Sequence, residues 1–355
     1  MEERIHLRDR ARGCLIGGAI GDALGYPVEF ISVSAIHRRY GESGIQALEC
    51  DPKTGTAIIS DDTQMVLFTA NGLLLSEARG KRPVEGWIYA AYLDWMRTQG
   101  RRVKAEKLCW LNEIPELNAL RAPGNTCLNA LGSGKMGSVD EPINNSKGCG
   151  GIMRVAPVAI YGFVKGWDEE RIVRLGAEAA AITHGHPLGW MSSAALVDIV
   201  YRELNGASPR QAVEECIAAL HRIYADDPWT EKLTKPMERA LELADDRMRT
   251  DLQCLNLLGE GWVGDEALYV SIYCAVKYAD DFDRAMTVSV NHSGDSDSTG
   301  AVTGNILGAY LGYDAISDKW KGALELHDLI LEISDDLCAA ENERDARWME
   351  KYAGK

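Results

Sequence analysis

The chain has 355 residues, 46% of them hydrophobic, and a formal net charge of −15. No stretch approaches the roughly 18 consecutive apolar residues that a membrane span requires, and such an acidic chain is poorly suited to binding nucleic-acid phosphates. The N-terminal sequence MEERIHLRDRARG is charged and lacks the apolar core of a signal peptide. We therefore expect a cytoplasmic protein that binds neither membranes nor nucleic acids.

Helical periodicity dominates the chain. Eight segments are predicted to form amphipathic or buried helices: residues 64–79, 84–99, 168–182, 188–204, 208–224, 230–247, 265–279 and 321–335. The best strand candidate is Ala57-Ile58-Ile59. Since there is no linker-like composition and no internal repeat, we predict a single all-α domain over residues 1–355.

Two segments carry a glycine at every fourth position. Glycines with this spacing lie on one face of a helix, where a neighbouring helix can approach closely. Each series also borders acidic residues, Asp22 and Glu29 in one case and Asp295 and Asp297 in the other. The two series are Gly13, Gly17, Gly21, Gly25 and Gly300, Gly304, Gly308, Gly312.

Two short acidic turns each precede an apolar helix. One is Ser60-Asp61-Asp62-Thr63, and the other lies within the sequence NHSGDSDSTG, residues 291–300. A serine or aspartate at such a position caps a helix N-terminus. Capping needs only one oxygen acceptor, however, and a second acid adds repulsion unless a cation is near.

Together the two turns provide an oxygen-only ligand set. Carboxylates and hydroxyls suit Mg²⁺ or Mn²⁺, and this set is large enough for two ions. A calcium-binding EF-hand loop is excluded because Ile306 stands at its twelfth position, and the DDxxD motif of helical prenyl synthases would need an acid at Met65. The predicted ligands are Ser60, Asp61, Asp62, Asp295, Asp297 and Ser298.

Three further segments are polar but less specific. The glycine-rich sequence NSKGCGGIMR, residues 145–154, could direct N–H groups at a ligand or form a simple tight loop. Asn125 could be only a helix cap, and His184 only a partner of a helix dipole. His186 precedes a proline and is predicted to be structural. The nine cysteines include no CxxC pair, which argues against a zinc cluster and favours buried thiols.

Taken in order, these segments resemble the ADP-ribosylglycohydrolase family, which includes dinitrogenase-reductase-activating glycohydrolase and the ADP-ribosylarginine hydrolases. The resemblance covers residues 12–312 approximately. Each motif alone is ordinary, but six in the family's order are specific. They are GCLIGGAIGDALGYPVEF, SDDTQM, APGNTCLNAL, SKGCGGIMRVAP, ITHGHP and SGDSDSTGAVTGNILGAY.

The resemblance implies a role for each matching residue. Two Mg²⁺ or Mn²⁺ ions would lie at the centre of the domain between the two acidic turns, with Glu29 on a loop that covers them. The catalytic residues would be Glu29, Asp61, Asp62 and Asp297. The ADP-ribose pocket would be lined by Gly124, Asn125, Ser146, Lys147, Gly148, Cys149, Gly150, Gly151, Met153 and His184. Cys149 departs from the larger polar or aromatic residue of some members.

The implied activity is hydrolysis of the C1″ glycosidic bond of ADP-ribose attached to a protein, with arginine as the expected acceptor and an ADP-ribosyltransferase acting in opposition. Acceptor contacts are expected from residues 87–110, where Tyr89, Tyr92 and Asp94 are candidates, although that segment also fits an ordinary exposed helix. Serine, O-acetyl-ADP-ribose or nucleic-acid linkages remain open, as does a non-catalytic role in binding ADP-ribose or in structure. Retention of all six predicted ligands favours catalysis.

Overall fold

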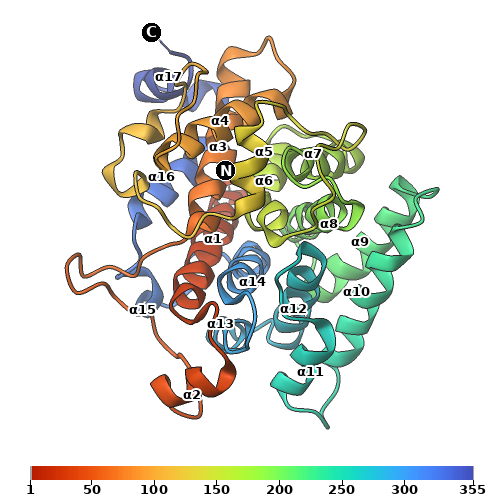
Figure 1. Ribbon diagram of the computed structural model, residues 1–355. Coiled ribbons are helices and arrows are strands. Elements are labelled where there is room, and N and C mark those ends of the chain that lie inside the picture. The colour runs from red at the N-terminus through yellow and green to blue at the C-terminus, as the bar shows by residue number, and fades with distance from the viewer. Residues whose placement is uncertain (1, 355) are drawn as a thin grey trace.

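Two glycine-rich helices, α1 (Glu2–Gly25) and α14 (Ser296–Leu311), lie side by side at the centre of the computed structural model, which describes residues 2–354 (Figure 1). A Cβ atom placed on Gly17 would lie 2.3 Å from the carbonyl oxygen of Gly304, and one placed on Gly304 would lie 1.9 Å from that of Gly17. The close packing predicted from the glycine spacing is therefore confirmed, and any side chain at these positions would separate the helices.

The two helices run antiparallel. Gly13 faces Gly308 near one end of the pair, and Gly25 faces Ser296 at the other. The C-terminal end of α1 is thus held beside the N-terminal end of α14, although the two are far apart in sequence.

The remaining helices surround this pair (Figure 1). Helices α8, α12 and α13 pack on α14, while α3 and α16 pack on α1. The other α-helices are α2 (Val33–Tyr40), α3 (Asp61–Arg79), α4 (Val84–Thr98), α5 (Asn125–Gly132), α6 (Ala156–Val164), α7 (Glu169–Ala181), α8 (Pro187–Leu204), α9 (Pro209–Ile223), α10 (Thr230–Ala244), α11 (Asp251–Leu258), α12 (Gly264–Lys277), α13 (Phe282–Val290), α15 (Asp318–Lys321), α16 (His327–Cys338) and α17 (Ala346–Tyr352). Short 3₁₀ helices are η1 (Tyr26–Val28), η2 (Trp110–Glu113), η3 (Pro115–Leu117), η4 (Cys149–Arg154) and η5 (Glu341–Glu343).

The predicted all-helical class is confirmed for the described part of the chain. Helices from both ends of the sequence pack on the same core, since α17 contacts α3 and α16 contacts α1, so the fold is one compact domain. Seven of the eight predicted helices are present as α3, α4, α7, α8, α9, α10 and α12, with ends within a few residues of those predicted.

The eighth predicted helix, residues 321–335, is wrong in its first turns. Helix α15 ends at Lys321 and α16 begins at His327, after Leu326 in a left-handed conformation (φ 60°). Between them, Ala57 donates from its N–H to the carbonyl of Ala323 (2.7 Å) and accepts from the N–H of Glu325 (3.0 Å). Because the carbonyl of Ala323 and the N–H of Glu325 are hydrogen-bonded to Ala57, they cannot also form the hydrogen bonds of a helix.

The strand predicted at Ala57-Ile58-Ile59 is also wrong. Ala57 forms only isolated bridges, with Cys50 and with Leu324, and no strand occurs within residues 2–354. Strand pairing does not continue beyond Ala57, because the N–H of Ile59 donates to the Glu325 carboxylate (3.2 Å) instead of to a backbone carbonyl.

None of the cysteines forms a disulfide in the structure. Seven are buried, Cys149 is half-buried and Cys50 is exposed, so the prediction of buried thiols is wrong for Cys50. Over the described range, no single helix is long and apolar enough to cross a membrane; one pair of segments, Ile5–Val28 and Val33–Tyr40, meets the length and composition criteria jointly but is bent by 94°.

The glycine contact predicts the effect of adding a methyl group. G304A should lower the free energy of unfolding by about 2 kcal/mol or more, because the new Cβ overpacks a backbone contact that cannot yield. G86A in α4 is the matched control, since its Cβ would meet only the Arg82 side chain at 3.9 Å, and it should raise stability by up to about 1 kcal/mol. Urea unfolding of both variants measures this; equal, small effects would contradict backbone contact.

Candidate metal centre

Three chain segments meet where α1 ends and α14 begins. The first carries Glu29, which follows η1; the others are the N-terminal turns of α3 and α14. A Cβ on Gly25 would lie 2.3 Å from the carbonyl oxygen of Ser296, so the antiparallel helix pair itself brings Glu29 to Asp295 and Asp297. The ligand oxygens of these three acids all lie within 4.8 Å of one another.

The turn at the start of α3 forms the adjoining wall of the site. Ser298 donates from its hydroxyl to Asp62 Oδ2 (3.0 Å), which links the two acidic turns. Gly124 donates from its N–H to Asp61 Oδ2 (3.3 Å). The structure therefore brings all six predicted ligands into one region, with Glu29 in the closest group.

Capping and ligand roles coexist in these turns. Ser60 is the N-cap of α3 and accepts from the N–H of Asp62 (3.1 Å). Asp295 is the N-cap of α14 and accepts from the N–H of Ser298 (3.2 Å). Two capping oxygens suffice for two helices, so capping leaves the remaining acids unexplained.

The buried carboxylates give the site the negative charge that a cation-binding site requires. Asp61, Asp62, Asp295 and Asp297 are each at most 5% exposed. Burial raises the pKa of all four, and the charge of Asp297 raises those of the other three further. The charges that raise these pKa values belong to other carboxylates, among them Asp22 and Asp297.

The effect of burial and of neighbouring negative charges is clearest for the pKa of Glu29. Burial and then the charge of Asp297 raise the pKa of Glu29 to about 10. Its Oε2 atom is buried without a hydrogen-bond partner. Like charges packed together out of water are costly unless paired with positive charge. These oxygen-only donors therefore fit a hard divalent ion.

Asp22, which the sequence did not identify as a site residue, supports the first turn. It is fully buried in α1, and its carboxylate accepts from the N–H groups of Ser60 (3.0 Å) and Thr63 (3.0 Å) and from the Thr63 hydroxyl. Burial and then the charge of Asp297 raise its pKa to about 7, and these donors lower it. An aspartate within an apolar, glycine-rich helix was the available signal.

The glycine loop before η4 is only partly free to bind a ligand. The N–H of Gly148 donates to Ser146 Oγ (3.3 Å), and that of Cys149 donates to the carbonyl of Trp262 (3.3 Å). These two amides are thus engaged within the protein, although the resemblance implies that residues 146–151 all line the ADP-ribose pocket. Gly150 follows in the first turn of η4, where a 3₁₀ helix leaves its N–H group without an internal acceptor.

His184 lies beneath this loop in a fixed arrangement. Its Nδ1 is 2.8 Å from Thr183 Oγ1, which also accepts from Arg154 Nη2 (2.6 Å). Arginine can only donate, so the threonine hydroxyl is free to direct its own hydrogen to Nδ1. The imidazole proton is then assigned to Nε2, which faces the backbone of Gly148 and Gly150.

The protonation state of His184 follows from its surroundings. Burial and then the charge of Arg154 lower the pKa of His184 to about 3, so the ring is neutral near pH 7. Of the other predicted pocket residues, Met153 is buried, Lys147 is half-buried in an ion pair with Asp265 (3.0 Å), and Gly124 and Asn125 are exposed at the start of α5.

Two predicted acceptor contacts are wrong. Tyr92 is fully buried, with its hydroxyl 2.8 Å from that of Thr69. Asp94 is also fully buried, and its carboxylate accepts from Arg97 (2.9 Å) and from the N–H groups of Leu108 (2.7 Å) and Cys109 (2.8 Å). Neither side chain can reach a substrate, because both serve packing within the fold.

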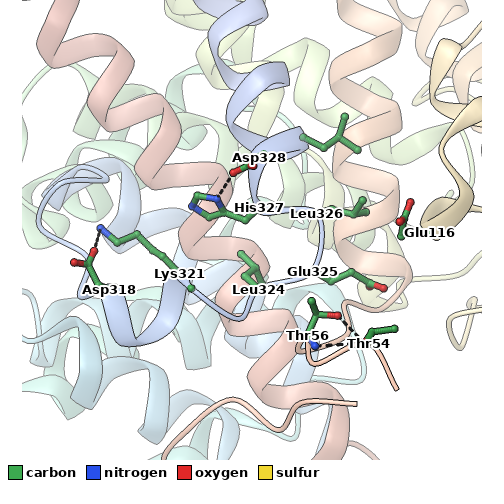
Figure 2. A pocket seen from close by; sticks show the side chains of 12 residues that line it. Thr54, Thr56, Glu116, Asp318, Lys321, Leu324, Glu325, Leu326, His327 and Asp328 are labelled. Atoms are coloured by element: carbon green, nitrogen blue, oxygen red, sulfur yellow. Dashed lines mark hydrogen bonds and ion pairs between the residues drawn. The ribbon is translucent and has the colours of Figure 1, made fainter. Parts of the chain in front are cut away.

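Of two surface hollows, only one contains a predicted site residue. The first has a volume of about 740 Å³. Figure 2 shows that Lys321 pairs there with Asp318 (3.0 Å) and His327 with Asp328 (2.8 Å). It is lined by none of the predicted site residues. A second hollow, of about 640 Å³, includes Ser146 and thus borders the glycine loop.

Comparisons with known proteins identify the family that the chain matches. The ADP-ribosylglycohydrolase family model matches residues 3–347. The mouse (Mus musculus) ADP-ribosylhydrolase ARH3 is 25% identical, covering 89% of this chain and 87% of its own. The ADP-ribosyl-[dinitrogen reductase] glycohydrolase of Rhodospirillum rubrum is 26% identical, covering 90% and 92%. The ADP-ribosylarginine hydrolase Tri1 of Serratia proteamaculans is 26% identical, covering 93% and 79%.

The fold also matches a solved structure, an ADP-ribosylglycohydrolase-related protein complex. The TM-score is 0.62 at 22% identity, over 95% of this chain and 98% of that one. At this identity the match concerns the fold alone.

The support given by Asp22 predicts a loss of metal affinity. D22N should weaken Mg²⁺ or Mn²⁺ binding about 10- to 100-fold, because an amide cannot accept all the bonds that hold the Ser60–Thr63 turn. D94N is the matched control, since it alters an equally buried carboxylate that also accepts backbone N–H groups. Calorimetric titration with each ion measures this; equal affinities in both variants would refute the role of Asp22.

Proposed function

The chain belongs to the ADP-ribosylglycohydrolase family, whose members hydrolyse ADP-ribose linkages, and we propose that it removes ADP-ribose from arginine side chains of modified proteins by cleaving the C1″ glycosidic bond. The observation that carries this proposal is the group formed by Glu29, Asp295 and Asp297 beside the Asp61-Asp62 turn. Its chemistry is that of a metal-assisted hydrolase, and the family is metal-dependent.

Two Mg²⁺ or Mn²⁺ ions are proposed as the cofactors. Their ligands would come from Ser60, Asp61, Asp62, Asp295, Asp297 and Ser298. When bound, the cations would neutralise the buried carboxylates and act as Lewis acids toward substrate oxygens. The protein itself holds the ligands in position. Asp22 accepts from the backbone of the Ser60–Thr63 turn, and Ser298 links that turn to the start of α14 by donating to Asp62.

Glu29 is the proposed proton carrier. Cleavage of the C1″–nitrogen bond requires a proton at the leaving guanidine and removal of one from the attacking water. The Oε2 atom of Glu29 has no partner in the described protein, whereas Asp61 and Asp62 each accept a hydrogen bond at Oδ2. The surrounding carboxylates, Asp297 among them, would stabilise positive character at C1″.

The ADP-ribose moiety is proposed to lie along the glycine loop. His184 would donate from Nε2–H, and the first-turn amide of η4 at Gly150 would hold a phosphate oxygen. Gly124 and Asn125 would line the ribose side, and the hollow beside Ser146 has room for the far end of the ligand. Backbone donors would let a chain of charge −15 bind an anion without a basic surface.

The arginine linkage is the finer part of the proposal. The Serratia relative is named for ADP-ribosylarginine, whereas the name of the mouse relative specifies no linkage. The proposed partners are an ADP-ribosylated protein and an opposing ADP-ribosyltransferase. Cytoplasmic location stays a prediction from the sequence.

The proposed function predicts metal-dependent release of ADP-ribose. The purified chain with Mg²⁺ or Mn²⁺ should release free ADP-ribose from an arginine-modified protein, and EDTA should abolish the release. D297N should lower the rate by about 100-fold or more, since it removes a central charged ligand. D318N, at an exposed carboxylate away from the site, should act like wild type. Liquid chromatography of the product measures all four reactions.

Other outcomes have distinct meanings. Release only from serine-linked or O-acetyl substrates would keep the site and reject the arginine linkage. ADP-ribose binding without release from any substrate would instead indicate a non-catalytic relative.

The hydrogen bonds that join Arg154, Thr183 and His184, which we call the His184 relay, predict a selective loss of ligand affinity when the Thr183 hydroxyl is removed. T183V should weaken ADP-ribose binding about tenfold, because removing the hydroxyl leaves buried donors and acceptors unsatisfied at a cost of about 1–3 kcal/mol. T183S keeps the hydroxyl and should bind within about threefold of wild type. Calorimetry gives the affinities, and circular dichroism checks folding. Equal affinity of T183V and T183S would exclude the relay.

A further inference from the structure

Phe30, directly after Glu29, is an unusual residue for its position. It is 70% exposed, and its backbone is in the left-handed region (φ 63°). A side chain in that region is strained, and glycine would avoid the strain. An exposed aromatic ring also contributes little to a core. Neither property helps the fold, so both point to a role at the site.

The ring of Phe30 has one defined partner. It stacks on Trp262, with ring centroids 5.2 Å apart and planes at 24°. Trp262 is half-buried in the loop before α12 and accepts from the N–H of Cys149 (3.3 Å). The stack thus joins the Glu29 segment to the wall beside the glycine loop and forms a rim at the carboxylates, which we call the aromatic rim (Phe30 and Trp262).

The aromatic rim is available to a cation from outside the protein. Many arginine and lysine side chains of the described chain lie over aromatic rings, but none lies over Phe30 or Trp262. The adjacent acids Glu29, Asp295 and Asp297 add negative potential at this rim. A planar cation is attracted both by the ring face and by these charges.

We propose that the aromatic rim recognises the acceptor side chain, with the guanidinium of an ADP-ribosylated arginine packed flat against Phe30. The inference rests on the proposed function, since it concerns the group to which ADP-ribose is attached. A serine acceptor has neither a planar surface nor a positive charge to place there. The rim therefore determines linkage specificity, while Glu29 beside it acts on the bond.

The test compares two substitutions that keep the strained backbone. F30L removes the ring and keeps apolar bulk, whereas F30Y keeps the ring. The substrates are two peptides with the same flanking sequence, one carrying arginine-linked and the other serine-linked ADP-ribose. F30L should lower kcat/KM for the arginine-linked peptide about three- to fivefold, as expected for one exposed cation–π contact, and F30Y should stay within about twofold. The ratio of the two substrates' kcat/KM values should fall in F30L and not in F30Y.

The controls separate this inference from the proposed function. M248A removes an apolar side chain that is 93% exposed, between α10 and α11, and should not move the ratio. Equal losses on both peptides in F30L would overturn acceptor recognition, as would weaker binding of free ADP-ribose measured by calorimetry. Failure of the wild-type chain to release ADP-ribose from either peptide would overturn the proposed function, and the inference with it.

Discussion

The backbone contact between α1 and α14 is the constraint on which the site depends. Because Gly17 and Gly304 have no side chains, the helices approach until carbonyl oxygens occupy the space that a Cβ would need. An antiparallel pair at this distance has little freedom to slide, since its glycines must stay opposite one another. The end of α1 is therefore held at the start of α14, and Glu29 is placed against Asp295 and Asp297.

That placement concentrates negative charge in a buried volume. The carboxylates lie almost wholly out of water, and their pKa values are raised by burial and by one another. In a protein that only had to be stable, such a cluster would be a cost. Here the acids lie at the N-termini of α3 and α14, where the helix dipoles and capping N–H groups offset part of the repulsion between the carboxylates. A divalent cation would offset the rest.

Residues behind the site hold its geometry without reaching a substrate. Asp22 holds the first acidic turn through backbone N–H groups, and Arg154 with Thr183 sets the orientation of His184. Both supports are buried and make several hydrogen bonds, so they resist small movements. Phe30 differs, since its backbone strain and exposure serve the rim of the site and not the core. The molecule thus combines a well-bonded interior with a small exposed surface that we propose distinguishes between acceptors.

The sequence by itself predicted most of the helices, the close glycine packing and the two acidic turns. These features are local, because helix periodicity, capping residues and clustered acids can be recognised within about 20 residues. The tertiary structure decided which acids meet, how Asp22, Arg154 and Thr183 act, and why Tyr92 and Asp94 are buried. It also broke the predicted helix at Leu326, where pairing with Ala57 replaced helical hydrogen bonds. Each of these outcomes depends on contacts between segments far apart in the chain, and no local pattern specifies such contacts.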